Sequence, residues 1–244
     1  MTEPDNQTAT GQPVAISSSV RSCHAALRLA KVLGMLTILL GLSVLAGWAL
    51  HIESLKTVLP GYVSMAPNTA LCFTLSGMAL LIGYLSRPRA WKKTCASMLA
   101  MLVILIGGAT LAEYPSHQSP GLDQWLFTDS LASAGEAHPG RMAPQTTIAF
   151  LLFGSALILL SRGPRAARAA QALALAGLFI ALLALIGYLF NAQVFISFFS
   201  LTPVAIPTIA GFWLLGVAIL CARPKKASWP SCWRTIREAS SRGG

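Results

Sequence analysis

From Ala169 to Ala222 the chain runs for 54 residues without a single Asp, Glu, Lys or Arg. One helix of that length would measure about 80 Å at 1.5 Å per residue, far more than the roughly 30 Å thickness of a bilayer's hydrocarbon core. Polar residues between Asn191 and Pro203 interrupt the run near its middle. The stretch therefore predicts two membrane spans joined by a reversal of the chain.

The composition also indicates an integral membrane protein. Of the 244 residues, 55% are hydrophobic and only 11% are charged, whereas soluble domains carry about 25% charged residues. The net charge of +10 would suit a nucleic-acid partner, but the basic residues lie in short clusters beside the apolar stretches, as membrane topology requires. We therefore expect the lipid bilayer, and not nucleic acid, to be the main partner of the chain.

Charge and hydropathy together predict an all-α protein with six transmembrane helices and both termini in the cytoplasm. Of the 18 Lys and Arg residues, only Lys56 and Arg141 fall on the predicted outer side. The predicted units are a disordered cytoplasmic tail at 1–20, a membrane domain at 21–226 and a basic cytoplasmic tail at 227–244. The predicted spans are 32–50, 67–86, 94–112, 142–161, 171–190 and 204–222.

A sequence repeat arranges these spans as three helical hairpins. Met-Ala-Pro precedes a span at residues 65–67 and again at 142–144, and proline suits the first turn of a helix. The pattern Thr-x-x-x-Phe-x-x-x-Gly begins at Thr69, at Thr146 and at Thr208, which places Thr, Phe and Gly on one helical face. The chain therefore predicts three copies of one hairpin, an arrangement common in membrane proteins.

The residues with chemical potential do not form a catalytic or metal site. No catalytic motif occurs and no charged residue lies inside a predicted span, so we expect no enzyme, and an ion-coupled transporter is disfavoured. His51 and His117 stand near acidic residues on the predicted outer side, but their spacing does not support a metal site. The five cysteines include no Cys-x-x-Cys pair. We expect no cofactor and no disulfide.

The candidate site lies at the outer ends of the second, fourth and sixth spans. In the predicted topology the N-termini of these three spans all face outward, and each carries free N–H groups and a partial positive charge. If the three ends converge, they form a polar or anion-accepting pocket. If they do not, the same side chains cap their own helices. The candidate residues are Asn68, Thr69, Arg141, Gln145, Thr146 and Thr208, with Trp48, Tyr114 and Tyr188 as walls or as interfacial anchors.

Several motifs in a fixed order carry a family resemblance. They are the segment from Met65 to Phe73, the sequence Gly-Leu-Asp-Gln-Trp-Leu-Phe at 121–127, Gly-Arg-Met-Ala-Pro at 140–144, Gly-Tyr-Leu at 187–189 and Ala-Arg-Pro at 222–224. Together they resemble the multi-span sensor region at the amino terminus of many bacterial histidine kinases and diguanylate cyclases. The resemblance covers about residues 30–226. It departs from the family at 204–207, where Val-Ala-Ile-Pro replaces an expected Met-Ala-Leu start, and no output domain follows Arg223.

The resemblance implies a sensory module in the bacterial inner membrane that detects a periplasmic or membrane-borne stimulus. It also implies a separate signalling partner, a kinase or a cyclase, and it leaves a homodimer open. Two other functions are consistent with the residues: a small-solute transporter or channel, and a membrane scaffold subunit without a ligand. A saturable ligand that alters a cytoplasmic partner would favour the sensor, whereas net flux of solute would favour the transporter.

Overall fold

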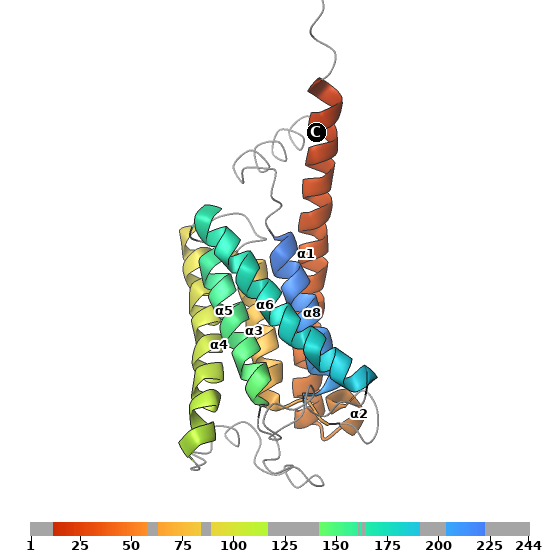
Figure 1. Ribbon diagram of the computed structural model, residues 1–244, viewed down its shortest axis with the longest axis vertical. Coiled ribbons are helices and arrows are strands. Elements are labelled where there is room, and N and C mark those ends of the chain that lie inside the picture. Colours follow the sequence, from red (N-terminus) through yellow and green to blue (C-terminus); the bar gives the residue numbers. More distant parts are fainter. Residues whose placement is uncertain are drawn as a thin grey trace, which may run out of the picture.

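The computed structural model describes residues 12–57, 63–83, 89–116, 142–160, 162, 164–190 and 204–222. In this part of the chain the regular secondary structure is entirely helical (Figure 1), which confirms the predicted all-α class. The helices are α1 (Gln12–Ala49), α2 (Glu53–Lys56), α3 (Pro67–Gly83), α4 (Ala90–Ser116), α5 (Pro144–Leu160), α6 (Pro164–Leu189) and α8 (Ile206–Cys221).

Three of these helices, α1, α4 and α6, contain segments long and apolar enough to cross a membrane. The segments are His24–Ala49, Ala90–Tyr114 and Ala166–Leu189. The helices α3, α5 and α8 are also apolar but shorter, with 17, 17 and 16 residues. The structure therefore has the character of a membrane protein.

The six long helices form a closed ring of three hairpins. Within the hairpins α1 packs on α3, α4 on α5 and α6 on α8, while contacts of α3 with α4, α5 with α6 and α8 with α1 join one hairpin to the next. The helices α3, α5 and α8 also contact one another and lie inside α1, α4 and α6 (Figure 1). We call the first set the inner helices and the second set the outer helices.

Each outer helix packs through a narrow stripe of buried residues that alternate by three and four positions. This spacing is the seam of a left-handed coiled coil, and the small residues in it let the helices approach closely. The buried stripe consists of Leu27, Ala30, Gly34, Thr37, Gly41, Val44 and Trp48 in α1, of Ala96, Ala100, Val103, Gly107 and Thr110 in α4, and of Ala167, Ala170, Ala174, Gly177, Ala181 and Ala184 in α6.

The glycines of the sequence repeat mark a close approach of the two helices in each hairpin. Each of them receives an aliphatic side chain from its outer helix, and a Cβ added to the glycine would lie 2.6–2.7 Å from that side chain. In all three hairpins the aliphatic residue stands ten positions before the aromatic residue near the end of the outer helix, which is Trp48, Tyr114 or Tyr188. The pairs are Gly77 with Ile38, Gly154 with Ile104, and Gly216 with Leu178. The three hairpins therefore share one packing register.

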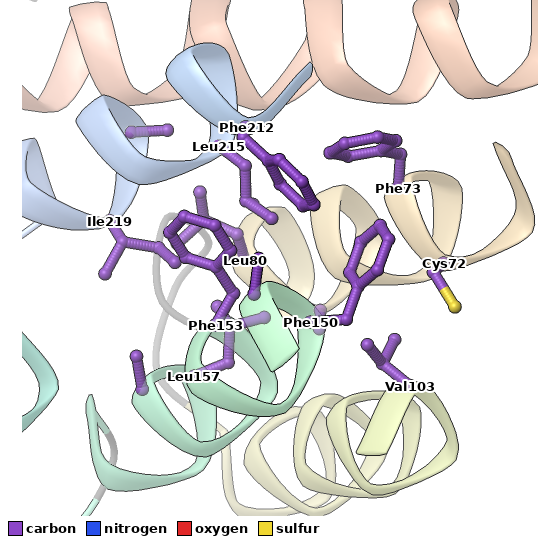
Figure 2. Packing of buried hydrophobic residues seen from close by; sticks show 14 of the residues in the cluster. Cys72, Phe73, Leu80, Val103, Phe150, Phe153, Leu157, Phe212, Leu215 and Ile219 are labelled. Atoms are coloured by element: carbon purple, nitrogen blue, oxygen red, sulfur yellow. The ribbon is translucent and has the colours of Figure 1, made fainter. Parts of the chain in front are cut away.

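The phenylalanines of the repeat meet at the centre of the ring (Figure 2). The ring centroids of Phe73 and Phe150 lie 4.9 Å apart, those of Phe73 and Phe212 5.1 Å, and those of Phe150 and Phe212 5.0 Å. Three nearly equal distances indicate that the inner helices are related by an approximate threefold axis. Phe153 stacks on Phe212 at 5.5 Å and extends this aromatic core.

The first helix starts earlier than the sequence suggested. Residues 12–20, which were predicted to belong to a disordered tail, are part of α1. Pro13 lies in the first turn of the helix, where proline is tolerated, and no further proline or glycine occurs before Gly34. The structure does not describe residues 1–11, most of the segment at 113–141 between the third and fourth predicted spans, or the predicted reversal at 191–203. Residues 223–244, which include the predicted basic tail at 227–244, also lie outside the described part of the chain.

Candidate functional site

An aromatic side chain joins the two helices of every hairpin at the same end of the bundle, which we call the aromatic end. The indole Nε1 of Trp48 donates a hydrogen bond to the main-chain oxygen of Met65 at 2.9 Å. The hydroxyl of Tyr114 donates to the oxygen of Met142 at 2.8 Å, and the hydroxyl of Tyr188 donates to the oxygen of Val204. In each hairpin the acceptor stands two residues before the inner helix begins.

The sequence placed Trp48, Tyr114 and Tyr188 at this end but did not predict their hydrogen bonds. Trp48 is only 3% exposed, and the two tyrosines are partly buried. A buried main-chain oxygen ahead of a helix needs a donor, since the helix itself supplies none there. A signal for these bonds was present in the constant spacing, because each acceptor lies four residues before the repeat threonine.

The first turns of the inner helices have no side-chain cap at the N-cap position. That position is occupied by Ala66, Ala143 and Ala205, and alanine has no oxygen to accept from the free N–H groups. The main-chain oxygens of these alanines accept the first helical hydrogen bonds, for example from Ala70 N at 3.1 Å and from Thr147 N at 3.0 Å. The candidate polar residues follow within the first turn instead.

Five of the predicted site residues form a buried polar layer at the aromatic end. Their side chains are nearly inaccessible although all of them are polar, and such burial is costly unless polar groups nearby satisfy them. The five are Asn68 and Thr69 on α3, Gln145 and Thr146 on α5, and Thr208 on α8, each with 2–5% of its surface exposed. The sixth, Arg141, lies outside the described residues.

The phenylalanine cluster forms the floor beneath this layer. Phe73, Phe150 and Phe212 each stand four residues, or about one helical turn, after the repeat threonine of the same helix. Because the three rings are in mutual contact, they bring the three inner helices together just below the polar residues. The inner helices therefore lie together at this depth, which is the condition that the pocket alternative required.

Lys56 is a buried basic residue at the aromatic end that was not among the predicted site residues. Its side chain is 2% exposed, its Nζ lies 2.7 Å from Oε1 of Glu53, and the same Nζ stands 4.5 Å from the centroid of the Trp48 ring. The main-chain N–H of Met65 also donates to the oxygen of Lys56 at 3.0 Å. The segment after α1 is thereby folded over Trp48. The only signal in the sequence was that Lys56 is a rare basic residue on the predicted outer side.

His51, considered above for a metal site, has a structural role at the end of α1. It adopts a positive φ of 56°, and the N–H groups of His51 and Ile52 donate to the oxygens of Trp48 and Gly47. This is the Schellman arrangement, in which a left-handed residue ends a helix. Among the residues that the structure describes, no three His, Cys, Asp or Glu side chains gather in a group that could hold a metal. His117 lies outside them.

Glu113 is a second ionisable residue buried at the aromatic end. It is 5% exposed and directly precedes Tyr114, the hydrogen-bonding aromatic residue of the second hairpin. The sequence predicted it in the outer loop, whereas the structure includes it in α4, which continues to Ser116. The aromatic end therefore contains buried polar residues from all three hairpins together with Lys56 and Glu113. Comparison of the chain with family models, with curated proteins and with solved structures found no match.

Proposed function

We propose that this chain is a sensory module of a bacterial inner membrane, with six spans and both termini in the cytoplasm. In this proposal a small polar or anionic ligand, or a membrane-borne stimulus, acts at the aromatic end on the periplasmic side. The response passes through the helices to a separate cytoplasmic partner, a kinase or a cyclase. The module itself is not an enzyme and carries no cofactor.

The arrangement of outer and inner helices supports six spans. The outer helices expose large apolar side chains, including Leu39 and Leu105 at 60% and Phe179 at 58% exposure, as a surface in contact with lipid requires. An inner helix of 16 or 17 residues measures about 25 Å, which is close to the thickness of the hydrocarbon core. Because the inner helices are largely enclosed by the outer ones, a modest shortfall in length brings few polar groups into contact with lipid.

The observation that carries the proposal is the buried polar layer above the phenylalanine floor. Asn68 and Gln145 occupy the same position in two hairpins, and a threonine follows each of them. These side chains stand in the first turns of helices whose N-termini favour negative charge. A carboxylate or phosphate group would find there both the helix dipoles and polar side chains. The resemblance of the repeat to sensor regions supports the same function.

The phenylalanine floor favours a sensor over a transporter or channel. Phe73, Phe150 and Phe212 contact one another across the approximate threefold axis, so their rings fill the axis at this depth. A ligand bound above the rings would change the contacts among three helices without passing between them. A transporter would need the rings to separate.

The test is a thermal-shift screen of the purified protein in mild detergent against small carboxylates, inorganic phosphate and amino acids. We expect at least one compound to raise the melting temperature with a saturable concentration dependence. The Asn68→Ala, Gln145→Ala double variant should lose more of this shift than the sum of the losses in the two single variants. The same compound should show no net flux into proteoliposomes. Strictly additive losses of stability, with no saturable compound, would reject the pocket, and measurable flux would favour the transporter.

A cross-linking experiment tests the second half of the proposal. The compound found in the screen is added to cells that carry a photocrosslinker at Lys93, on the predicted cytoplasmic side. We expect the compound to change the yield of one adduct with a kinase or cyclase, and the Asn68→Ala, Gln145→Ala double variant to abolish that change. An adduct whose yield is the same with and without the compound would support a scaffold subunit instead.

A further inference from the structure

Apart from Lys56, the basic residues whose side chains the structure describes gather at the end of the bundle opposite the aromatic residues, which we call the basic end. Six of the seven side chains described there are exposed, and Lys92 is partly buried. The two acidic residues within the described part of the chain, Glu53 and Glu113, both lie at the aromatic end. The described part of the basic end therefore has no carboxylate to neutralise it. Its residues are Arg28 and Lys31 of α1, Arg89, Lys92 and Lys93 at the start of α4, and Arg162 and Arg168 at the start of α6.

Three of these residues occupy matching depths, one in each hairpin. Arg28 stands 20 residues before Trp48, Lys93 stands 21 before Tyr114, and Arg168 stands 20 before Tyr188. At 1.5 Å per residue these spacings are about 30 Å, which matches the thickness of a hydrocarbon core. If the hydrogen-bonding aromatic residues lie at one interface, the three basic residues lie at the headgroup level of the other.

Two of these three residues, Arg28 and Arg168, lie on the outward side of their outer helices, and Lys93 is also exposed. Arg28 is exposed between the buried Leu27 and Ala30, and Arg168 is exposed between the buried Ala167 and Ala170. These side chains therefore point away from the helical packing and toward the position of surrounding lipid. Lys93 is exposed although it stands seven residues before Ala100, in line with the buried stripe of α4.

An exposed tryptophan lies in the basic cluster of the second hairpin, next to Lys92 and two residues before Lys93. Trp91 is 57% exposed, and Nζ of Lys92 stands 5.7 Å from the centroid of its ring. Tryptophan concentrates at the headgroup level of membranes, and basic clusters next to a span attract anionic lipids. The positive charge, the depth and the exposure of the three residues suit an anionic lipid headgroup.

We propose that the basic end selectively binds anionic phospholipid headgroups, with one site per hairpin at Arg28, Lys93 and Arg168. The inference rests on the proposed membrane-spanning function. It goes beyond that function, because basic residues that serve only to orient the chain during insertion would show no headgroup preference afterwards. The expected ligand is a phosphate diester of net negative charge, such as phosphatidylglycerol.

The experiment uses the full chain in nanodiscs that contain spin-labelled phosphatidylglycerol or spin-labelled phosphatidylcholine. Electron paramagnetic resonance gives the fraction of each lipid immobilised at the protein surface. We expect the relative association constant to favour phosphatidylglycerol and the preference to fall at high salt. Replacing Arg28, Lys93 and Arg168 by Gln removes one charge from each of the three sites and should therefore reduce the preference by roughly fivefold.

The matched control keeps the three charges as Arg28→Lys, Lys93→Arg and Arg168→Lys, and it should retain the preference. A second control, Lys56→Gln, removes one charge at the aromatic end and should leave the preference unchanged. Equal association of both lipids with the wild-type protein would overturn this inference and leave the membrane function standing. If neither lipid became immobilised at the protein surface, both this inference and the membrane function would be overturned.

Discussion

Trp48 donates a hydrogen bond from its indole Nε1 to the main-chain oxygen of Met65, and so connects the end of α1 to the residues that begin α3. Tyr114 and Tyr188 make the corresponding bonds in the other hairpins. Each bond satisfies a main-chain acceptor that the following helix cannot reach, and together with the close contacts at the repeat glycines it fixes how the two helices align. The ring of hairpins thus has one construction repeated three times.

Removing the tyrosine hydroxyls should lower stability by a similar amount in the two hairpins. Tyr114→Phe and Tyr188→Phe each delete one partly buried hydrogen bond, so we expect each to reduce the free energy of unfolding by about 1 kcal/mol. The losses should add, since the two bonds lie in different hairpins. The measurement is unfolding by sodium dodecyl sulfate in mixed micelles, with the partly exposed Trp213→Phe as control. A double variant as stable as the wild type would show that these bonds contribute nothing.

Enlarging the repeat glycines should destabilise the hairpins. In Gly77→Ala the new Cβ would lie 2.6 Å from Cγ1 of Ile38 and 3.0 Å from the oxygen of Gly34, and overpacking of this kind costs about 1–3 kcal/mol. The control is Gly108→Ala, where the nearest neighbouring atom, Cδ2 of Leu151, is 4.0 Å away. That change should be neutral or stabilising, because alanine favours a helix over glycine. Equal losses for both variants would argue against the close approach.

Ser76 and Thr147 should respond in opposite ways to removal of their hydroxyls. Ser76 is fully buried and its Oγ has no hydrogen-bond partner within the described structure, whereas Oγ1 of Thr147 donates to the oxygen of Pro144 at 2.6 Å. We expect Ser76→Ala to raise the unfolding free energy by about 1 kcal/mol and Thr147→Val to lower it by a similar amount. Chemical unfolding in the same micelles measures both changes. A lower free energy of unfolding in Ser76→Ala would contradict the absence, within the described part of the chain, of a hydrogen-bond partner for Oγ of Ser76.

The phenylalanine floor should behave as one coupled unit. A double-mutant cycle with Phe73→Leu and Phe150→Leu should give a coupling energy of about 0.5–1.5 kcal/mol, as expected for aromatic side chains in contact. The control cycle pairs Phe73 with Phe179, which is exposed on α6, and should give none. A coupling near zero between Phe73 and Phe150 would mean that the rings do not meet in the membrane.

The sequence predicted the inner helices well because proline and the repeat mark their starts. The predicted spans at 67–86, 142–161 and 204–222 differ from α3, α5 and α8 by at most three residues at either end. The outer helices were predicted less well, since hydropathy reports the apolar part of a helix and not its polar extension. Helix α1 begins at Gln12 and α4 continues to Ser116, and both extensions consist of residues that hydropathy assigned to tails or loops.

The polar layer at the candidate site could be predicted in part. The positions of Asn68, Gln145 and the repeat threonines followed from the sequence repeat, and a common depth for them followed from the topology. The hydrogen bonds of Trp48, Tyr114 and Tyr188 were not predicted, because their acceptors are main-chain oxygens. The constant spacing of these acceptors from the repeat threonines was the signal that the sequence contained. The burial of Lys56 depends on the fold of the segment after α1, which hydropathy does not encode.

The most direct test of the proposed six-span module is its membrane topology, measured by cysteine labelling in intact cells. The five native cysteines are replaced first, and single cysteines are then placed at Ser54, Ser119 or Ala192 on the predicted outer side and at Lys93 or Arg162 on the inner side. We predict that an impermeant maleimide labels the first three positions in intact cells and the last two only after permeabilisation. Labelling of position 93 or 162 from outside, or protection of position 54, would contradict the proposed topology.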